Sequence, residues 1–295
     1  MKDHLFEFEN YLKNEKNSSA NTMQSYIRDL TQFSAYCSNF NFKDLADVNT
    51  DFISNYFNHL RSTGRSESTL TRAAASLRCY YKFLDKYGLG KDNPVSKLKQ
   101  KAAPKKLPEI LTNKEVLLLL EQPSGTDYKA CRDKAMLELL YATGIKVSEL
   151  IELKISDVNL HIGILHMHSG KNERIIPIYP EAIKVLTKYL NDVRPVVVMN
   201  SAEDRLFTNM TGGALSRQGF WKIVKHYAQL AKINKDITPH TLRHSFAAHL
   251  LENGAQLKDI KEMLGHSDIS STQIYAQLMK QKYAQAYKRF HPLAR

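Results

Sequence analysis

Residues 89–109 read LGKDNPVSKLKQKAAPKKLPE, and this stretch divides the sequence in two. It contains three prolines and a run of lysines but little apolar periodicity. Proline lacks a backbone donor and restricts the residue before it, so such a segment is typical of a connector rather than of a packed helix. The pattern predicts two domains, residues 1–99 and 110–295, joined by a basic linker at residues 100–109.

The segment before the linker is expected to fold as four helices. Apolar residues recur there at helical spacing, and Asn49 and Gly64 bound the third helix. The fourth helix is expected from about Ser66 to Tyr87, with an apolar stripe and, to one side of it, a basic face rich in hydroxyl groups. A helix of this length fits a DNA groove, whereas an ordinary solvated face is the alternative. The expected DNA contacts on it are Arg72, Arg78 and Lys82.

The segment after the linker is expected to be mostly helical with one small β element. Residues 164–178, ILHMHSGKNERIIPI, show two alternating runs around a polar turn at residues 169–172, which predicts a β-hairpin. The fold class is therefore mainly α. It comprises an N-terminal domain of four helices and a mixed, mostly helical domain with a small β-sheet or hairpin.

Charge is distributed unevenly over the 295 residues, which carry a formal net charge of +12. Residues 1–50 hold 5 basic and 7 acidic side chains, a net charge of −2. Residues 51–109 hold 12 basic and 5 acidic side chains, a net charge of +7. Such a balance favours a nucleic acid over a membrane as the partner. Three cysteines without a pairing pattern, no export signal and no apolar run long enough to span a bilayer predict a cytoplasmic protein.

Two stretches near the C-terminus carry residues suited to phosphodiester chemistry. HTLRHSFAAHLLENGA, residues 240–255, places His240 and Arg243 on one helical face, and LGHSDISSTQIYAQL, residues 264–278, contains His266 and Tyr275. Cleavage without a metal requires cations on the phosphate, a nucleophile that can hold the phosphoryl group and groups that move protons. Together with Lys171 in the hairpin turn, the expected acid, these side chains supply all three.

Other catalytic classes fit the sequence less well. His240 and His244 have the spacing of zinc ligands, but Thr241 stands where a zinc hydrolase has glutamate. A nucleophile elbow and the glycine patterns of phosphate-binding loops are absent from the sequence. We therefore expect neither a metal nor another cofactor.

These motifs, with ELLYATGIKVSELIEL before them and FHPLAR at the C-terminus, resemble the tyrosine recombinase (phage integrase) family, most closely its Xer type. The resemblance covers almost the whole chain. It implies a core-binding domain at residues 1–99 and a catalytic domain at 110–295 that close on DNA as a clamp. It also implies that Tyr275 attacks the scissile phosphate, giving a 3′-phosphotyrosyl intermediate.

Further roles follow from the same resemblance. Arg243 would hold the phosphate, His240 and His266 would assist by proton transfer and hydrogen bonding, and Lys171 would protonate the leaving 5′ oxygen. Strand exchange would pass through a Holliday junction at a dif-like or attachment site, in chromosome dimer resolution or in movement of a mobile element. The implied assembly is a homotetramer or a heterotetramer with a paralogous recombinase, with a DNA translocase as a further partner and no membrane.

The sequence departs from the family pattern in two places: the hairpin turn SGKNER, residues 169–174, is one residue shorter than usual, and position 146 carries a different residue. In YATGIKVSEL, residues 141–150, Lys146 stands where the family has its first catalytic arginine, and Glu149 matches the acidic residue that follows it. Taken locally, Lys146 would be an ordinary cation after a helix end that is marked by Gly144. An ammonium lacks the planar fork of a guanidinium, so the substitution predicts a slow enzyme. A weakened DNA-binding partner subunit and a relaxing topoisomerase are the alternatives.

Two further DNA contacts are expected in the second domain. Arg217 and Gln218 lie in SRQGFW, residues 216–221, at the expected start of a helix. A solvated helix end is the alternative for both.

Overall fold

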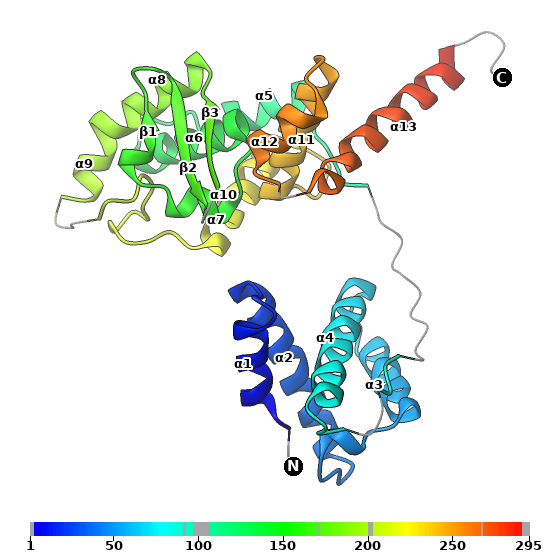
Figure 1. Cartoon of the computed structure of the whole chain (residues 1–295). Coiled ribbons are helices and arrows are strands. Elements are labelled where there is room, and N and C mark those ends of the chain that lie inside the picture. Colours follow the sequence, from blue (N-terminus) through cyan, green and yellow to red (C-terminus); the bar gives the residue numbers. More distant parts are fainter. Residues whose placement is uncertain are drawn as a thin grey trace. The chain divides into compact units, whose positions relative to one another are not determined.

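The computed structural model describes residues 3–90, 93–96, 107–169, 172–199, 203–266 and 268–290. The chain divides into two compact units, Met1–Lys105 and Lys106–Arg295 (Figure 1). The division falls inside the stretch expected as a linker, residues 100–109, of which only 107–109 are among the described residues.

Four helices build the first unit. They are α1 (Leu5–Asn14), α2 (Ala20–Ser38), α3 (Thr50–Ser62) and α4 (Glu67–Lys86), with a short 3-10 turn at Leu45–Asp47 before α3. Ser19, Asn49 and Ser66 cap α2, α3 and α4, each accepting a backbone N–H three residues ahead. The starts of α3 and α4 agree with the expected cap at Asn49 and the expected helix start near Ser66.

The core of the first unit is aromatic and contains one buried carboxylate. Asp29 on α2 lies 2.9 Å from the guanidinium of Arg72 and accepts a hydrogen bond of 3.1 Å from Ser76, both on α4. Burial raises the pKa of Asp29, and the nearby Arg72 charge opposes that rise. The ion pair thus joins α2 to α4 inside the unit.

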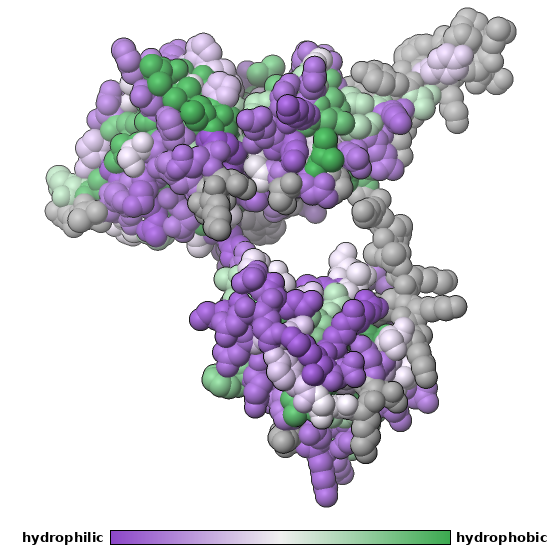
Figure 2. Space-filling view, viewed as in Figure 1, coloured by the Kyte–Doolittle hydropathy of each residue, from purple (hydrophilic) through white to green (hydrophobic). Residues whose placement is uncertain are grey.

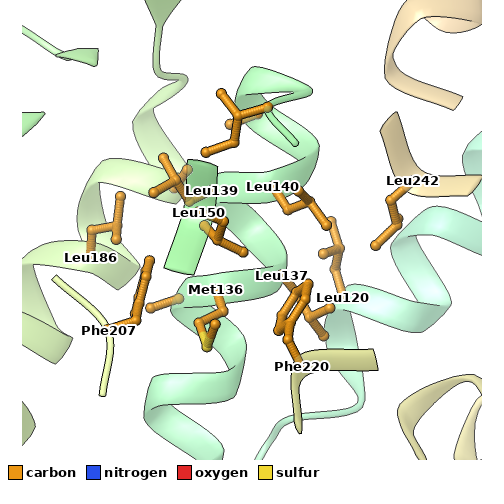
Figure 3. Close-up of a cluster of buried hydrophobic side chains, with 14 of the residues drawn as sticks. Leu120, Met136, Leu137, Leu139, Leu140, Leu150, Leu186, Phe207, Phe220 and Leu242 are labelled. Carbon is orange, nitrogen blue, oxygen red and sulfur yellow. The ribbon is translucent and has the colours of Figure 1, made fainter. Parts of the chain in front are cut away.

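The second unit is mostly helical. It contains α5 (Asn113–Glu121), α6 (Tyr128–Thr143), α7 (Val147–Glu152), α8 (Pro180–Lys188), α9 (Arg194–Val197), α10 (Arg217–Leu230), α11 (Pro239–Glu252), α12 (Leu257–Leu264) and α13 (Gln273–Phe290). A π-helical stretch, Tyr189–Val193, joins α8 to α9. Helix α6 is buried on nearly every side, and Figure 3 shows its Met136, Leu137, Leu139 and Leu140 among leucine and phenylalanine side chains of other elements. It is the central helix of this unit.

A three-stranded antiparallel sheet completes the unit, in the order β1 (Val158–Asn159), β2 (Ile164–Ser169) and β3 (Asn172–Pro177). The expected hairpin is β2–β3, while β1, a strand of two residues, was not expected. Leu165 pairs with Ile176, and Met167 pairs with Arg174. Since paired residues share a face, Arg174 lies on the buried face of the sheet, opposite Met167 and beside the apolar pair of Leu165 and Ile176.

The backbone of Leu111, just before α5, is tied to α11. Its N–H donates to the Ser245 hydroxyl at 2.8 Å, and its carbonyl accepts from His249 Nε2 at 2.8 Å. His249 Nδ1 in turn accepts from the Tyr141 hydroxyl at 2.8 Å, because Nε2 carries the proton. His249 is therefore a buried structural histidine.

No helix among the described residues is long and apolar enough to cross a membrane. On the face seen in Figure 2, hydrophilic residues cover most of both units.

Candidate active site

Helix α11 carries three of the polar residues that converge in the second unit. Thr238 caps its first turn by accepting the Thr241 N–H at 3.3 Å, and Pro239 occupies the first helical position. The spacing then places His240, Arg243 and His244 on neighbouring positions of one face. The start of α11 thus projects two imidazoles and a guanidinium in one direction.

Arg243 is buried, and all of its partners are neutral. The guanidinium donates to the carbonyls of Gly144 and of Leu264, the latter at 2.8 Å, and lies 3.1 Å from His266 Nε2. Gly144 and Leu264 lie at the C-terminal ends of α6 and α12, where helix dipoles place partial negative charge. No carboxylate of the described residues forms an ion pair with Arg243, although burial lowers its pKa. The cation is held in place without being neutralised.

The geometry around His266 fixes its tautomer. Arginine only donates, so His266 Nε2 accepts from Arg243, and Nδ1–H donates to the Thr272 hydroxyl at 2.9 Å. Burial, followed by the charges of Arg243, Lys146 and Arg174, lowers the pKa of His266 to about 4. The ring is therefore neutral at physiological pH.

Two glycines shape the turns beside these residues. Gly144 and Gly265 follow α6 and α12 with φ angles of 60° and 64°, a backbone conformation that favours glycine. A Cβ on Gly144 would lie 2.3 Å from the Phe246 ring, and one on Gly265 would lie 2.7 Å from the Arg174 guanidinium. Both helix ends therefore exclude larger residues where they meet Arg243.

Tyr275 lies in the first turn of α13 and is only 1% exposed. Its hydroxyl lies 2.9 Å from Nδ1 of His244, a residue not expected at the site from the sequence. Burial raises the pKa of Tyr275, whereas the Arg243 charge lowers it. The phenol is therefore protonated and close to the guanidinium expected to hold the phosphate.

His240 is exposed and lies one turn before His244, with their ring centroids 6.5 Å apart. Desolvation by neighbouring protein atoms lowers the pKa of His240, and the Arg243 charge lowers it further. It does not contact Tyr275 in this structure, because His244 occupies that place.

Lys146 follows the end of α6 and is also the N-cap residue, immediately before α7. Its backbone N–H donates to the Glu149 carboxylate at 2.8 Å, while its side chain is exposed. No carboxylate of the described residues forms an ion pair with the ammonium. Its positive charge is one of those that lower the pKa of His266. A cation at a helix N-terminus is opposed by the macrodipole, so the interpretation as a favourable helix-end charge does not explain this position.

Arg174 is a second residue that was not expected at the site. Its Nη2 donates to Glu149 at 2.8 Å and its Nε to the carbonyl of Met263 at 2.9 Å. One guanidinium thereby connects β3, the start of α7 at Lys146 and the end of α12 before His266. The sequence contained a sign of this role, because Arg174 continues the inward-facing alternation of Ile176 and Ile178.

Lys171 lies outside the described residues, between the end of β2 and the start of β3. The expected DNA contacts are dispersed. Arg72 is paired with Asp29, Arg78 is half-buried on α4, and Lys82 is exposed on the same helix.

Arg217 and Gln218 are exposed in the first turn of α10, after the cap Ser216. No hydrogen bond or ion pair among the described residues joins them to the cluster around Arg243. They stay predicted DNA contacts.

One region of the second unit combines three imidazoles, a phenol and the cations Arg243, Lys146 and Arg174. Such a set can bind a phosphodiester, supply an oxygen nucleophile and transfer protons. Within the described ranges, no group of three or more His, Cys, Asp or Glu side chains is placed to hold a metal ion.

Two family models match the chain. The model for the phage integrase family matches residues 109–282, and that for the phage integrase N-terminal SAM-like domain matches residues 5–88. Curated relatives named tyrosine recombinase XerD, from Halalkalibacterium halodurans and Staphylococcus epidermidis, are 44% and 42% identical to it. These alignments cover 99% and 98% of this chain and 98% of each relative.

Solved structures also match. XerA recombinase is 29% identical, with a TM-score of 0.56 and 98% of both chains covered. XerH recombinase bound to a palindromic difH substrate in a post-cleavage complex has a TM-score of 0.76 at 23% identity, covering 96% of this chain and 84% of that one. At that identity, the second match shows a shared fold.

Proposed function

The chain belongs to the phage integrase family, and we propose that Tyr275, Arg243 and the residues around them form its active site. It is a tyrosine recombinase, an enzyme that performs site-specific recombination of DNA. The proposed site residues are Tyr275, Arg243, His240, His266, Lys171 and Lys146.

Cleavage begins at Tyr275. The phenolic oxygen attacks the scissile phosphorus while its proton passes to a neighbouring base, for which His240 is the proposed residue. The bond from phosphorus to the 5′ oxygen breaks, and Lys171 protonates that oxygen. The products are a 3′-phosphotyrosyl link and a free 5′-hydroxyl, so the energy of the phosphodiester is retained without a nucleotide cofactor.

Arg243 and Lys146 stabilise the phosphorane-like transition state by binding the non-bridging oxygens, where negative charge accumulates. The neutral ring of His266 contacts Arg243 and supports its orientation. The observation that carries this proposal is Arg243 itself. It is a buried cation on neutral acceptors, in the same cluster as a buried tyrosine hydroxyl.

Strand exchange follows when the free 5′-hydroxyl attacks the phosphotyrosine of a partner duplex, which gives a Holliday junction. This requires several subunits on DNA, as a homotetramer or with a paralogous recombinase. Solved relatives of this fold include a lambda integrase tetramer bound to a Holliday junction. We propose that the end of α13, which extends away from the rest of its unit in Figure 1, contacts a neighbouring subunit in this assembly.

For the cellular role we propose chromosome dimer resolution in the bacterial cytoplasm at a dif-like site, with a DNA translocase as a further partner. The XerD relatives, similar over almost their full length, support this role over movement of a mobile element. The free thiols of the chain suit a reducing compartment.

The test is covalent capture on nicked duplexes. Binding sites are first selected from a random DNA library with the full-length protein, and the enriched sequence is then nicked next to each candidate scissile phosphate so that cleavage cannot reverse. Wild-type protein should form a denaturation-resistant adduct, and Tyr275→Phe should form none. An adduct that persists in Tyr275→Phe would remove Tyr275 as the nucleophile.

The alternative function is that of a DNA-binding partner subunit with weakened catalysis. The observation that favours it is Lys146, an exposed ammonium at the position of the family arginine. Wild-type protein that binds the selected duplex but gives no adduct at any nick position would support this alternative.

A further inference from the structure

The nucleophile proposed above is stored where DNA cannot reach it. Tyr275 is 1% exposed and packs in a small apolar cluster with Phe246, Ala247, Ile260 and Leu264. A phosphodiester must touch the phenolic oxygen in order to react with it. The hydroxyl must therefore leave this position before cleavage, and whatever holds it there controls its availability.

The polar contact that holds it is with His244. The distance from Nδ1 to the hydroxyl is 2.9 Å, and the ring centroids lie 5.7 Å apart. A buried O–H requires an acceptor, and His244 is the acceptor that the described residues provide, so the tyrosine donates. Burial and the nearby charges of Arg243 and of the other two histidines, should these be protonated, lower the pKa of His244 to about 4. The ring is therefore neutral and able to accept.

Other contacts hold the start of α13 without touching the hydroxyl. Thr272, one turn before Tyr275, accepts from His266 at 2.9 Å. The apolar cluster holds the ring but offers no partner to its oxygen. His244 alone among these residues distinguishes tyrosine from phenylalanine.

We propose that His244 is a positioning residue that holds the Tyr275 hydroxyl in its buried place until DNA binds. The inference rests on the proposed role of Tyr275 as the nucleophile. Loss of the acceptor leaves a buried O–H unsatisfied, which favours conformations in which Tyr275 meets solvent. Asparagine can place its side-chain oxygen near the former Nδ1 and preserve the contact, whereas leucine cannot.

The experiment measures the reactivity of Tyr275 in the DNA-free, full-length protein. N-acetylimidazole acetylates accessible tyrosines. The chain has 15 tyrosines, and peptide mass spectrometry distinguishes acetylation at Tyr275 from acetylation at the others. Tyr128, which is 46% exposed, serves as the internal reference. The ratio of labelling at Tyr275 to labelling at Tyr128 should rise about tenfold in His244→Leu and stay within about twofold of wild type in His244→Asn.

Two controls keep the result interpretable. His226→Leu removes an imidazole on α10 whose ring contact is with Tyr227 rather than with His244 or Tyr275, so its ratio should match wild type. His244→Phe, closer in shape to the native ring, replaces His244→Leu if the latter does not fold, as judged by its melting curve.

Equal ratios in wild type and in a folded His244→Leu or His244→Phe would overturn the proposal, as would equal increases in the leucine and asparagine variants. Failure of the proposed function looks different. In that case wild-type protein gives no adduct on nicked duplexes, whatever the labelling ratios are.

Discussion

Two buried arginines of the second unit, Arg132 and Arg243, differ in what surrounds their charge. Arg132, 4% exposed, binds the Asp133 carboxylate through Nε at 2.9 Å and Nη2 at 2.6 Å. Arg243, 5% exposed, contacts two carbonyls and an imidazole. The first charge is cancelled by a carboxylate, whereas the second is only solvated by dipoles.

The comparison shows how one unit uses the same side chain for stability and for chemistry. A carboxylate beside Arg243 would compete with a phosphate for the guanidinium, while helix ends hold it and leave most of its positive charge to attract an anion. Burial without a carboxylate is not sufficient alone, because Arg194 also donates to carbonyls, all within residues 203–206. What sets Arg243 apart is that its partners come from two helix ends that continue into Lys146 and His266.

The largest effect is expected from Arg243→Gln. Losing two charge-assisted hydrogen bonds to the phosphate, each worth about 1.5–3 kcal/mol, should slow single-turnover adduct formation about a thousandfold. The measurement is the rate of adduct formation on a nicked duplex at saturating protein.

Arg132→Gln is the matched control for that prediction. Asp133 would be left buried and unpaired, so the free energy of unfolding should fall by about 3–5 kcal/mol, with cleavage by the folded fraction near wild type. If Arg132→Gln slowed cleavage as much as Arg243→Gln, the distinction between the two arginines would be wrong.

Arg174 combines both roles, since it is paired with Glu149 and connects three segments of the site. Arg174→Met should reduce the rate of adduct formation about a hundredfold and the free energy of unfolding by about 3–5 kcal/mol, because Glu149 loses its partner. In Arg174→Met/Glu149→Gln the lone charge is gone, so stability should recover while the rate stays low. Recovery of both together would mean that Arg174 acts through stability alone.

Lys146→Arg restores the planar fork at the exposed position. One regained charge-assisted hydrogen bond should accelerate adduct formation about ten- to a hundredfold. Lys146→Gln, which removes the charge, should slow the same step. An unchanged rate in Lys146→Arg would show that this position does not limit cleavage.

The effect of pH is expected on stability rather than on the rate of cleavage. His244 and His266 have pKa values of about 4 in the folded protein, below their ordinary 6.5, so unfolding takes up protons between these values. Their contribution to stability is complete above pH 6.5. It is lost as pH falls toward 4, by up to about 1.4 kcal/mol per pH unit for each ring. The free energy of unfolding, measured with denaturant at several pH values in this range, should depend less steeply on pH in His244→Asn than in wild type. An equal dependence on pH in the two proteins would contradict the low pKa assigned to His244.

The sequence predicted most of the fold because its signals are local. Caps such as Asn49 and Ser66 and the alternation in β2 and β3 depend on near neighbours along the chain. β1 has two residues, too few to show a period. The motif residues His240, Arg243, His266 and Tyr275 were expected together, and the structure brings them into one cluster.

The missed residues depend on contacts between distant segments. His244 accepts from a tyrosine 31 positions away, and Arg174 meets a carbonyl 89 positions away. Arg72 stays a predicted DNA contact, but its ion pair with Asp29 was not expected, because nothing local shows that Asp29 lies opposite it. Helical spacing shows which residues share one face of a helix. It does not show which residue of another helix contacts that face.

The two hydrogen bonds at Leu111 have a mechanical consequence. They fix both backbone groups of Leu111, just before α5, and both partners belong to the helix that carries Arg243. A pulling force on the chain ahead of Leu111 would therefore act on α11 as well as on α5, which follows Leu111 in the sequence. Tension in the chain just before Leu111 would thus reach the helix on which Arg243 lies.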